Sequence, residues 1–507
     1  MTKSNSVKRS LIASIVSVSV CVLMALGTTF AWFTDSAKTA VNKIQAGELK
    51  VDIVNESGKE SVQNTGLKFK NADGISGETL LWEPGCTYKT EGFKIKNNGN
   101  LALKYKLALN GITGDSDLLK VISFSVVKED GSAVDLSTFE GTLNAKNELS
   151  EVLYIQGHMA ESASNFYQGK ELTGLGLTVV ATQDTYESDS KDNSYDELAE
   201  YPVIVNNTAE FTTAIRSAVG GETIILGSDI DLSSIISINK KLTINLAGYS
   251  LSSSAQYTLQ LNFGADVTVT DSSAGAAGVL TNTYSGKATP YAAVDLKGKG
   301  AVFTLESGTV QSNANDNFYS IAIGNSGKKE CTVNINGGTV SNPDGHIKSR
   351  AIHASNGMTV NINGGIVNGG LCALDTYVGS VSNINGGKLY SNAVERRNDE
   401  YGKSYAIRAK GEAQINIGSQ NAETVPNVKG IIFEASGVKT ALPKINLLKG
   451  EITNPIYSKE PKSNYSLFKL GITADAPVTF IDNTASYFLN DDLQMIQSGS
   501  VWKVTSK

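Results

Sequence analysis

A short motif repeats along the C-terminal half of the chain and restricts the fold more than any other feature. Copies read CTVNINGGTVSN from Cys331, MTVNINGGIVNGG from Met358 and VSNINGGKLYSN from Val381. A second motif, an alanine followed by an aliphatic residue, precedes each copy as AIG, AIH or ALD. Self-similarity with a period of about 20 to 50 residues is typical of solenoids. We therefore predict stacked coils with two short strands each and surface loops of variable length.

The alternation inside the motif predicts a right-handed parallel β-helix. In the first copy, Val333 and Ile335 would face the core, and the asparagines next to them would face solvent. The two glycines that follow would turn a corner where side chains would clash. Equivalent asparagines would stack at about 4.8 Å as a structural ladder. The predicted architecture resembles the pectate-lyase-like β-helix superfamily, and the resemblance is one of architecture and not of active-site motif.

The stretch before the repeats predicts one amphipathic helix. Asn207 and Glu210 have the spacing of a capping box, and an apolar stripe begins at Phe211. A glycine pair that begins at Gly220 would end the helix. We expect this helix to cap the open end of a β-helix domain that spans residues 203–507.

The N-terminal third of the chain alternates with period two, which predicts antiparallel strands. In LALKYKLAL, residues 101–109, leucines and a tyrosine share one face and lysines the other. NNGN, residues 97–100, would form a left-handed turn that joins this strand to the preceding one. We predict a jelly-roll-like β-sandwich over residues 32–183, in an all-β chain. Residues 184–202 are acidic and poor in aliphatic side chains, which predicts a solvated linker.

The first 31 residues have the pattern of an export signal. Three basic residues precede an apolar run from Leu11 to Trp32, and no acidic residue comes before Asp35. The run is also long enough, at about 20 residues, to cross a bilayer, so a retained anchor is the alternative. The small residues Thr29 and Ala31 favour cleavage next to Trp32. We therefore predict a signal peptide over residues 1–31 and a secreted protein.

Three segments resemble the TasA/camelysin family of exported bacterial proteins. They read GTTFAWFTDSAKTAVNKIQAGELKVDI at 27–53, LWEPGCTYKTEGFKIKNNGNLALKYKLAL at 81–109 and LTVVATQDTYES at 177–188. The resemblance implies the sandwich fold and cleavage by a SipW-type signal peptidase. It also implies a place in the extracellular matrix or on the cell surface of a Gram-positive type bacterium.

The same resemblance implies assembly into biofilm fibres. In TasA-type fibres the N-terminal strand of one subunit completes the sheet of the next subunit. The donor here would be residues 32–45, with Trp32 and Phe33 as apolar plugs. The partners would be further copies of this chain or TasA-like fibre proteins. The alternative is a segment that folds back on its own sheet or stays disordered.

Several other functions are disfavoured by the composition. Camelysin is described as a metalloprotease, but His158, His346 and His353 form no H-E-x-x-H pair. The four cysteines include no C-x-x-C pair, and Cys21 lies in the predicted signal, so a disulfide framework is not expected. The net charge of −6 argues against a nucleic-acid partner. We expect no metal and no cofactor.

One catalytic site is suggested by the residues that follow the second motif. If the aliphatic residues point inward, an outward column contains Asp295, Gly324, His353, Asp375 and Arg408. Asp375 would orient His353 as a general base, and Arg408 would bind a carboxylate of an acidic polysaccharide. The alternative is a polar column without catalysis, because the surface columns of a solenoid are polar in any case. A hydrolase with paired carboxylates would also need two acids close together. Asp295 and Asp375 are separated by two steps of the column, so we predict that the protein is not an enzyme.

A tyrosine- and arginine-rich insertion between two coils suggests a binding site for sugars. It reads YSNAVERRNDEYGKSY at residues 390–405, and long loops on a rigid scaffold often carry function. The glycan-binding candidates are Tyr390, Arg396, Arg397 and Tyr401, and the alternative is an ordinary solvated loop. We predict a biofilm-matrix or cell-surface protein whose β-helix is a rigid adhesive module. The rival hypothesis is a lyase or glycoside hydrolase that degrades an acidic polysaccharide.

Overall fold

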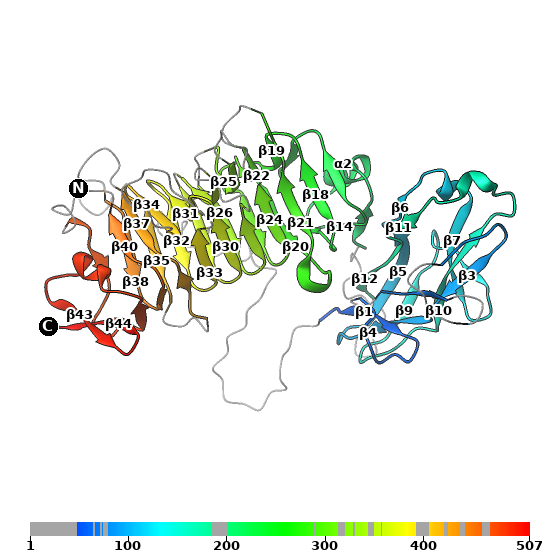
Figure 1. Cartoon of the computed structure of the whole chain (residues 1–507), viewed down its shortest axis with the longest axis horizontal. Coiled ribbons are helices and arrows are strands. Elements are labelled where there is room, and N and C mark those ends of the chain that lie inside the picture. The colour runs from blue at the N-terminus through cyan, green and yellow to red at the C-terminus, as the bar shows by residue number, and fades with distance from the viewer. Residues whose placement is uncertain are drawn as a thin grey trace, which may run out of the picture. The chain divides into compact units, whose positions relative to one another are not determined.

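The computed structural model describes most of the chain from residue 48 onward, and strands dominate it (Figure 1). Within 48–507 the description omits residues 64–65, 71–73, 75–79, 185–200, 287–290, 313–319, 328–329, 343–348, 356, 392–404, 420–423, 435–441 and 459–466. The predicted signal peptide, residues 1–31, lies outside the described residues. So do Trp32 and Phe33, together with most of the predicted linker.

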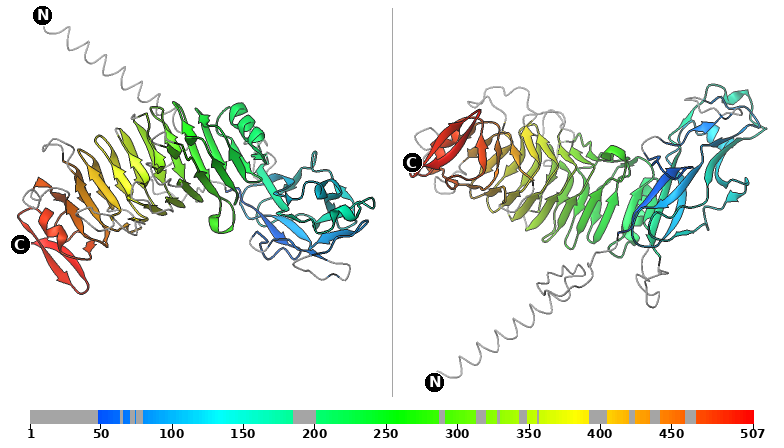
Figure 2. Two further views of the ribbon diagram at one scale, coloured as in Figure 1. Left: turned by 45° about the horizontal axis from the view of Figure 1, so that its top comes forward. Right: turned by 90° about the horizontal axis from the view of Figure 1, so that it is seen from below.

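Three parallel sheets run through the C-terminal part and make it a parallel β-helix (Figure 2). Sheet X has 11 described strands, each hydrogen-bonded to the next. In order they are β13 (Val203–Val205), β14 (Thr223–Leu226), β17 (Lys241–Asn245), β20 (Asp266–Thr270), β23 (Val302–Leu305), β26 (Cys331–Ile335), β29 (Met358–Ile362), β32 (Val381–Ile384), β35 (Gln414–Ile417), β38 (Lys444–Leu447) and β41 (Leu470–Gly471).

Sheets Y and Z are built in the same way from the strands between those of sheet X. Sheet Y contains β15 (Ile230–Leu232), β18 (Ser250–Ser253), β21 (Val279–Asn282), β24 (Thr309–Ser312), β27 (Thr339–Ser341), β30 (Ile366–Gly369), β33 (Lys388–Ser391), β36 (Asn427–Val428), β39 (Gly450–Ile452) and β42 (Val478–Phe480). Sheet Z contains β16 (Ile236–Ile238), β19 (Tyr257–Leu261), β22 (Tyr291–Leu296), β25 (Ser320–Gly324), β28 (Arg350–Ala354), β31 (Cys372–Thr376), β34 (Ile407–Lys410), β37 (Ile431–Glu434) and β40 (Ile456–Ser458).

Each full coil therefore contains three strands, and the prediction of two strands per coil was wrong. The strand missed from the sequence is the one in sheet Y, such as β27 at Thr339–Ser341. It follows directly after the corner glycines and is only three or four residues long in most coils. In the sequence it therefore merges with the strand before the corner into one apparent motif.

The inward and outward directions predicted for the motif are confirmed. In β26, Cys331, Val333 and Ile335 are buried, and the two residues between them are half-exposed. Val333 pairs with Val360 of the next coil, and the same residue types stack along sheet X. The inward side chains of all three sheets join one continuous hydrophobic core. Burial of that core is the main favourable term in the stability of the solenoid.

Asparagine side chains form two ladders on the outer face of sheet X. In the first, the Nδ2 of Asn361 donates to the Oδ1 of Asn334 over 2.9 Å, and Asn383 donates to Asn361 over 2.9 Å. The first ladder continues from Asn416 and Asn446, each donating to the previous coil. The second ladder joins Asn385 to Asn363 and Asn363 to Asn336, over 2.9 and 2.8 Å. Each amide therefore has a fixed orientation.

One α-helix, α2 (Thr208–Ser217), precedes the first full coil (Figure 1). Asn207 caps it by accepting a hydrogen bond from the backbone N–H of Glu210 over 3.0 Å. The Glu210 carboxylate accepts in return from the N–H of Asn206 over 2.8 Å, one residue earlier than in a standard capping box. Phe211 and Ile215 on one face of α2 belong to the continuous core.

The last strands of the chain reverse direction at the end of sheet Y. β42 pairs with β44 (Val501–Ser506) in antiparallel fashion, and β44 pairs with β43 (Leu493–Ser498). Val504 and Leu493 of this hairpin join the continuous core. The parallel stacking of sheet Y therefore ends in an antiparallel hairpin.

The N-terminal described part consists of antiparallel strands around its own core. One sheet contains β1 (Val51–Asn55), β4 (Phe93–Asn97), β10 (Leu153–Met159), β3 (Thr87–Thr90), β2 (Phe69–Lys70), β7 (Ile122–Lys128) and β8 (Ala133–Val134). Another contains β12 (Gly176–Gln183), β5 (Leu103–Asn110) and β9 (Gly141–Leu143), and β6 (Thr113–Gly114) pairs with β11 (Leu172–Thr173). Phe93 and Ile95 of the first sheet and Leu103 and Tyr105 of the second lie in one core cluster.

The turn predicted at residues 97–100 does not form a hairpin. β4 and β5 lie in different sheets, so this segment crosses from one sheet to the other. No residue of the segment has a positive φ angle. Instead, the Asn97 side chain accepts from the N–H of Gly99 over 2.9 Å and donates to the carbonyl of Leu101 over 2.7 Å. These side-chain bonds hold the crossover in place of a left-handed turn.

The corner glycines of the motif predict a strong sensitivity to substitution. Gly365 has φ +74°, and a Cβ there would lie 2.5 Å from the carbonyl oxygen of Gly338 in the previous coil. Gly300 has φ +75° with no atom within 4 Å of its Cβ position. We expect Gly300→Ala to cost about 1–3 kcal/mol from backbone strain. Gly365→Ala should cost clearly more, because the clash with backbone adds to the same strain.

The comparison uses the midpoint of urea unfolding, followed by circular dichroism, for both variants and the wild type. Equal midpoints for the two variants would show that the close approach of the coils at the corner does not matter.

Candidate functional site

The outward-facing residues of sheet Z form a column of polar side chains. The strand pairing places Asp295 beside Gly324, His353 beside Asp375, and Asp375 beside Arg408. The five residues proposed from the sequence thus follow one another along the face of sheet Z. Their side chains differ from the expectation in burial, because Asp295 and Asp375 are only 1% and 0% exposed.

Two consecutive inward residues in β28 bring a further arginine to this column. Ala351 and Ile352 both belong to the continuous core, so Arg350 before them and His353 after them lie outside it. Both of these outer side chains contact Asp375 on the neighbouring strand β31. An alanine and an aliphatic residue that both face inward therefore place a polar residue at each end of the motif.

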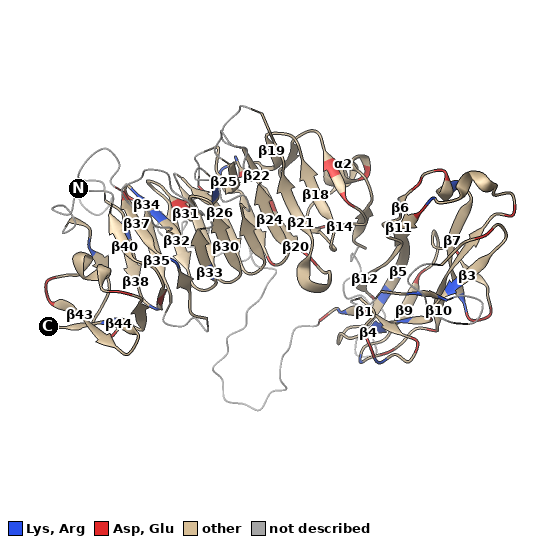
Figure 3. Ribbon diagram, viewed as in Figure 1, with Lys and Arg blue, Asp and Glu red and all other residues tan. Residues whose placement is uncertain are grey.

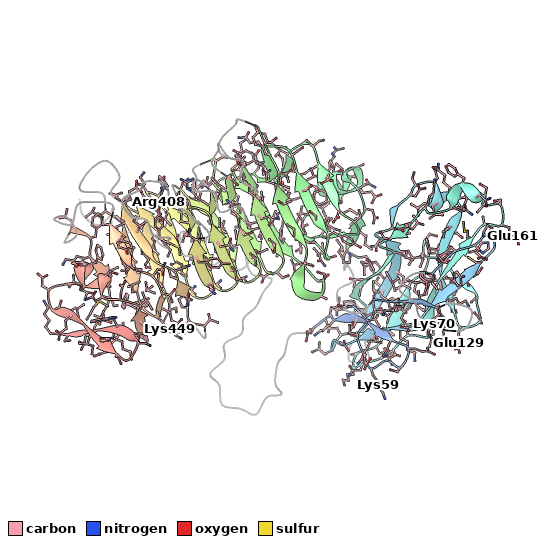
Figure 4. The ribbon with its side chains drawn as sticks, viewed as in Figure 1. Lys59, Lys70, Glu129, Glu161, Arg408 and Lys449 are labelled. Carbon is pink, nitrogen blue, oxygen red and sulfur yellow. The ribbon has the colours of Figure 1, made fainter. Side chains whose placement is uncertain are left out.

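Asp375 is the centre of the cluster and is completely buried. Arg408 Nε donates to its Oδ1 over 2.7 Å, and Arg408 Nη2 lies 3.1 Å from its Oδ2. Arg350 Nε donates to the same Oδ2. The Nδ1 of His353 lies 3.2 Å from Oδ2. Figure 4 labels Arg408 on β34, within the stacked strands of sheet Z.

The two arginines keep Asp375 ionised in spite of its burial. Burial alone would raise the pKa of Asp375, but the charges of Arg408 and Arg350 and the hydrogen bond with His353 outweigh it. The pKa of Asp375 therefore lies well below its usual range. Burial acts to lower the pKa of Arg408, but Asp375 and the other acidic neighbours, Glu434 among them, together outweigh burial and raise it. Both groups are charged at neutral pH.

Further charged and aromatic residues surround the arginine pair. Arg408 Nη2 donates to the hydroxyl of Tyr377 over 2.7 Å, and Arg408 Nε lies 3.8 Å from Glu434. Lys410 Nζ lies 3.2 Å from Glu434 and 5.1 Å from the centre of the Tyr377 ring. Figure 3 shows both basic and acidic residues around β31 and β34. The cluster is a network in which opposite charges face each other.

The geometry supports the predicted role of His353 as a general base and disfavours the predicted role of Arg408 as the group that binds a ligand carboxylate. A carboxylate at Nδ1 is the arrangement that orients a histidine and leaves its Nε2 for a proton. His353 meets that condition with a side chain 23% exposed, and its ring packs edge-on against Tyr377 at 5.0 Å. Arg408, in contrast, is engaged with groups of its own chain, so recognition of an external carboxylate would compete with Asp375.

Asp295 has a structural environment of its own. Its carboxylate accepts from Gln260 Nε2 over 2.9 Å, and from the Ser326 backbone N–H over 2.9 Å and hydroxyl over 2.7 Å. It therefore holds the turn after β25. The steps of Gly324 and His353 lie between Asp295 and Asp375, so these two acids do not form a hydrolase pair.

The buried thiol of Cys331 lies near this face. Burial and the charge of Asp295 raise the pKa of Cys331 to about 12. The thiol is therefore protonated at neutral pH, and Asn325 Nδ2 contacts its sulfur at 3.1 Å. A protonated, buried thiol does not act as a nucleophile.

Tyr390, the glycan-binding candidate that the structure describes, lies in a different sheet from the Asp375 cluster. Tyr390 lies on β33 of sheet Y, half-buried, where its hydroxyl accepts from Asn368 Nδ2 over 3.1 Å. Arg396, Arg397 and Tyr401 lie outside the described residues, as does His346. His158 belongs to the N-terminal part, where its Nδ1 lies 2.9 Å from the Thr87 hydroxyl.

Arg350 and Tyr377 are the members of the cluster that sequence reasoning missed. Arg350 stands directly before the AIH motif, and Tyr377 stands two residues after Asp375. The signal for Arg350 was available, because a charged residue immediately before a buried pair must face outward. Tyr377 offered no such signal, since it follows the end of its strand.

Comparisons with known proteins found no match among protein-family models, curated proteins or solved structures. The fold itself defines the class of protein: a repetitive, mainly β protein with the long parallel sheets of a β-helix. Across the part of the chain that the structure describes, no helix is long and apolar enough to span a membrane. Over the same residues, no group of three or more His, Cys, Asp or Glu side chains is placed to hold a metal ion.

Removal of the central carboxylate should destabilise the β-helix strongly. Asp375→Asn removes the negative charge that lies between Arg350 and Arg408 in a buried site, which costs about 3–5 kcal/mol. The matched control is Asp266→Asn, whose exposed carboxylate lies 3.7 Å from Lys241 and should contribute less than about 1 kcal/mol. The measurement is the midpoint of thermal unfolding at neutral pH.

The same variant has a defined pH dependence. Because the pKa of Asp375 is lowered on folding, its stabilising effect is present above the unfolded pKa of about 4 and is lost as the pH falls below it. The difference between wild type and Asp375→Asn should therefore shrink as the pH falls below about 4. A difference that grows on acidification would contradict this account of the cluster.

Proposed function

We propose that this protein is a secreted structural or adhesive component of a bacterial cell surface or biofilm matrix, and not an enzyme. The observation that carries the proposal is that the Asp375 cluster is closed on itself among the residues that the structure describes. The carboxylate of Asp375 is buried between Arg350 and Arg408, and Arg408 also binds Tyr377. A face whose charged groups are occupied by each other contributes rigidity and offers little acid–base chemistry.

The detailed architecture that we propose follows from the same observations. The β-helix winds in the right-handed sense, which is the rule for parallel crossover connections. Helix α2 caps its first coil, a role supported by Phe211 and Ile215 in the core. The N-terminal part is a jelly-roll-like sandwich, a proposal supported by antiparallel sheets that share one core.

Export and assembly are proposed from the N-terminal sequence. Residues 1–31 act as a signal that a SipW-type peptidase removes, and the mature protein reaches the surface or matrix of a Gram-positive type bacterium. The freed segment 32–45, with Trp32 and Phe33, adds a strand to a second copy of this chain or to a TasA-like fibre protein. The β-helix is then displayed along the fibre as a rigid module that binds glycans or surfaces, with Tyr390, Arg396, Arg397 and Tyr401 as candidate contacts.

The assembly proposal predicts fibres that depend on the N-terminal segment. Protein that begins at Trp32 should form fibres in negative-stain electron microscopy, because the free segment can enter the next subunit. Protein that begins at Ala46 should remain dispersed, and equal circular dichroism spectra would confirm that both are folded. Dispersed particles in both samples would contradict the donor-strand role. The β-helix would then be displayed by single molecules and not by fibres.

A second candidate function rests on the contact between His353 and Asp375. The Nδ1 of His353 faces a buried carboxylate while part of its ring is exposed. That arrangement is the minimum required of a general base in a lyase or glycoside hydrolase that acts on an acidic polysaccharide.

Incubation with polygalacturonate and alginate distinguishes the two candidates. We expect no release of reducing ends or unsaturated products above background from the wild type. If products are released, the His353→Ala variant tests their origin, with His158→Ala as a control on the N-terminal part. Activity that disappears only in His353→Ala would overturn the non-enzymatic proposal.

A further inference from the structure

We propose that the outer face of sheet X binds a neutral, extended polysaccharide, with one sugar against each coil. The ladder face is defined here as the outward side chains of 332–336, 359–363, 381–385 and 414–416. This inference rests on the proposed function of the β-helix as a glycan- or surface-binding module. The proposed binding face lies on sheet X, whereas Tyr390 lies on sheet Y and the Asp375 cluster lies on sheet Z.

The absence of charge on the ladder face indicates the kind of ligand. Its outward side chains are threonine, asparagine, valine and glutamine, although 94 residues of the chain (44 basic and 50 acidic) are charged. Charged residues border the ladder face: the Glu306 carboxylate accepts from Asn336 Nδ2 over 2.8 Å at one end, and Lys444 pairs with Gln414 at the other. A polysaccharide with carboxylate groups would find no counter-ion there. A neutral polysaccharide could bind there without burying a charged group that has no partner.

The asparagine ladders leave hydrogen-bonding groups for a ligand. An amide side chain has two N–H donors and an oxygen with two lone pairs. The ladder bonds of Asn363 use one N–H toward Asn336 and one lone pair toward Asn385. One donor and one acceptor therefore remain on each amide, and Asn336 and Asn363 are exposed. A pair of this kind matches a sugar hydroxyl, which both donates and accepts.

The orientation of these groups is fixed before any ligand arrives. The three inner amides of the first ladder, those of Asn361, Asn383 and Asn416, are held from both sides by bonds of 2.7 to 2.9 Å. A ligand therefore does not have to immobilise flexible side chains, which is a large part of the cost of binding to a protein surface. Preorganisation of this kind compensates for the lack of an aromatic platform on the ladder face.

The spacing of the groups fits an extended glycan. Coils repeat at the strand spacing of about 4.8 Å, and the two ladders lie two residues apart along each strand, or about 7 Å. An extended chain of β-linked hexoses advances by a distance comparable to the coil spacing at each sugar. Hydroxyls of successive sugars would therefore meet equivalent amides on successive coils. A protein partner fits less well, because it would bury these amides without a regular set of hydrogen-bonding groups in return.

Titration calorimetry with cello-oligosaccharides tests the proposal on the full mature chain. We expect the affinity to rise with length up to about four sugars, the number of coils in the ladder face, and then to level off. Asn363→Ala removes the central amide of the second ladder and should weaken binding of the longest oligosaccharide by about tenfold. The matched control is Asn427→Ala on sheet Y, which loses a bond of 2.9 Å to Glu451 and should bind normally.

A second variant separates binding from stability. Thr359→Glu adds a charge to the ladder face and leaves every ladder bond in place, so binding should fall while the melting temperature stays near that of the wild type. No binding of cello-oligosaccharides by the wild type, or an equal loss in Asn363→Ala and Asn427→Ala, would overturn the inference. Binding of polygalacturonate alone would also overturn it, but would leave the adhesive function and the separate fibre assay intact.

Discussion

Backbone hydrogen bonds between successive coils are the interaction on which the rest of the β-helix depends. They keep the strands of each sheet in parallel register, so a residue meets the equivalent residue of the next coil, as Val333 meets Val360. Three consequences follow from this stacking. Aliphatic side chains form one continuous core, asparagines form ladders, and corner glycines approach each other closely. The loops between strands do not share the register and vary in length.

The same stacking explains the candidate site. The residue that follows the inward pair of the second motif faces outward in each coil. Residues at this position therefore stack on one another, whatever charge they carry. Where the types are His353, Asp375 and Arg408, the stack becomes a buried ion cluster. Buried ion pairs are costly to desolvate, and they persist where additional hydrogen bonds satisfy the charges. Arg350 supplies an additional bond to Asp375, and Tyr377 supplies one to Arg408. Asp375 stays ionised because of the charges of Arg408 and Arg350 and the hydrogen bond with His353.

The periodic part of the fold was predictable from the sequence, and the contacts between coils were less so. Alternation in TVNING was sufficient for the inward and outward directions of sheet X, and the inward aliphatic residues of the second motif were sufficient for the column of sheet Z. The third strand of each coil was missed because it is short and directly follows the corner glycines. Arg350 was missed because its contact with Asp375 depends on two consecutive inward residues, an arrangement that ordinary alternation does not include. The hairpin expected at residues 97–100 failed because side-chain bonds of Asn97 hold a crossover between sheets.

The asparagine ladders also have a direction. From Asn361 to Asn446, each side chain donates its N–H to the coil that precedes it in the chain, and never to the coil that follows. A polypeptide emerges from the ribosome with its N-terminus first, so the earlier coil is complete before the later one is made. Each finished coil then presents ready acceptors of both backbone and side chain to the next. The ladders thus give the solenoid a chemical polarity, with a side-chain acceptor turned toward each following coil.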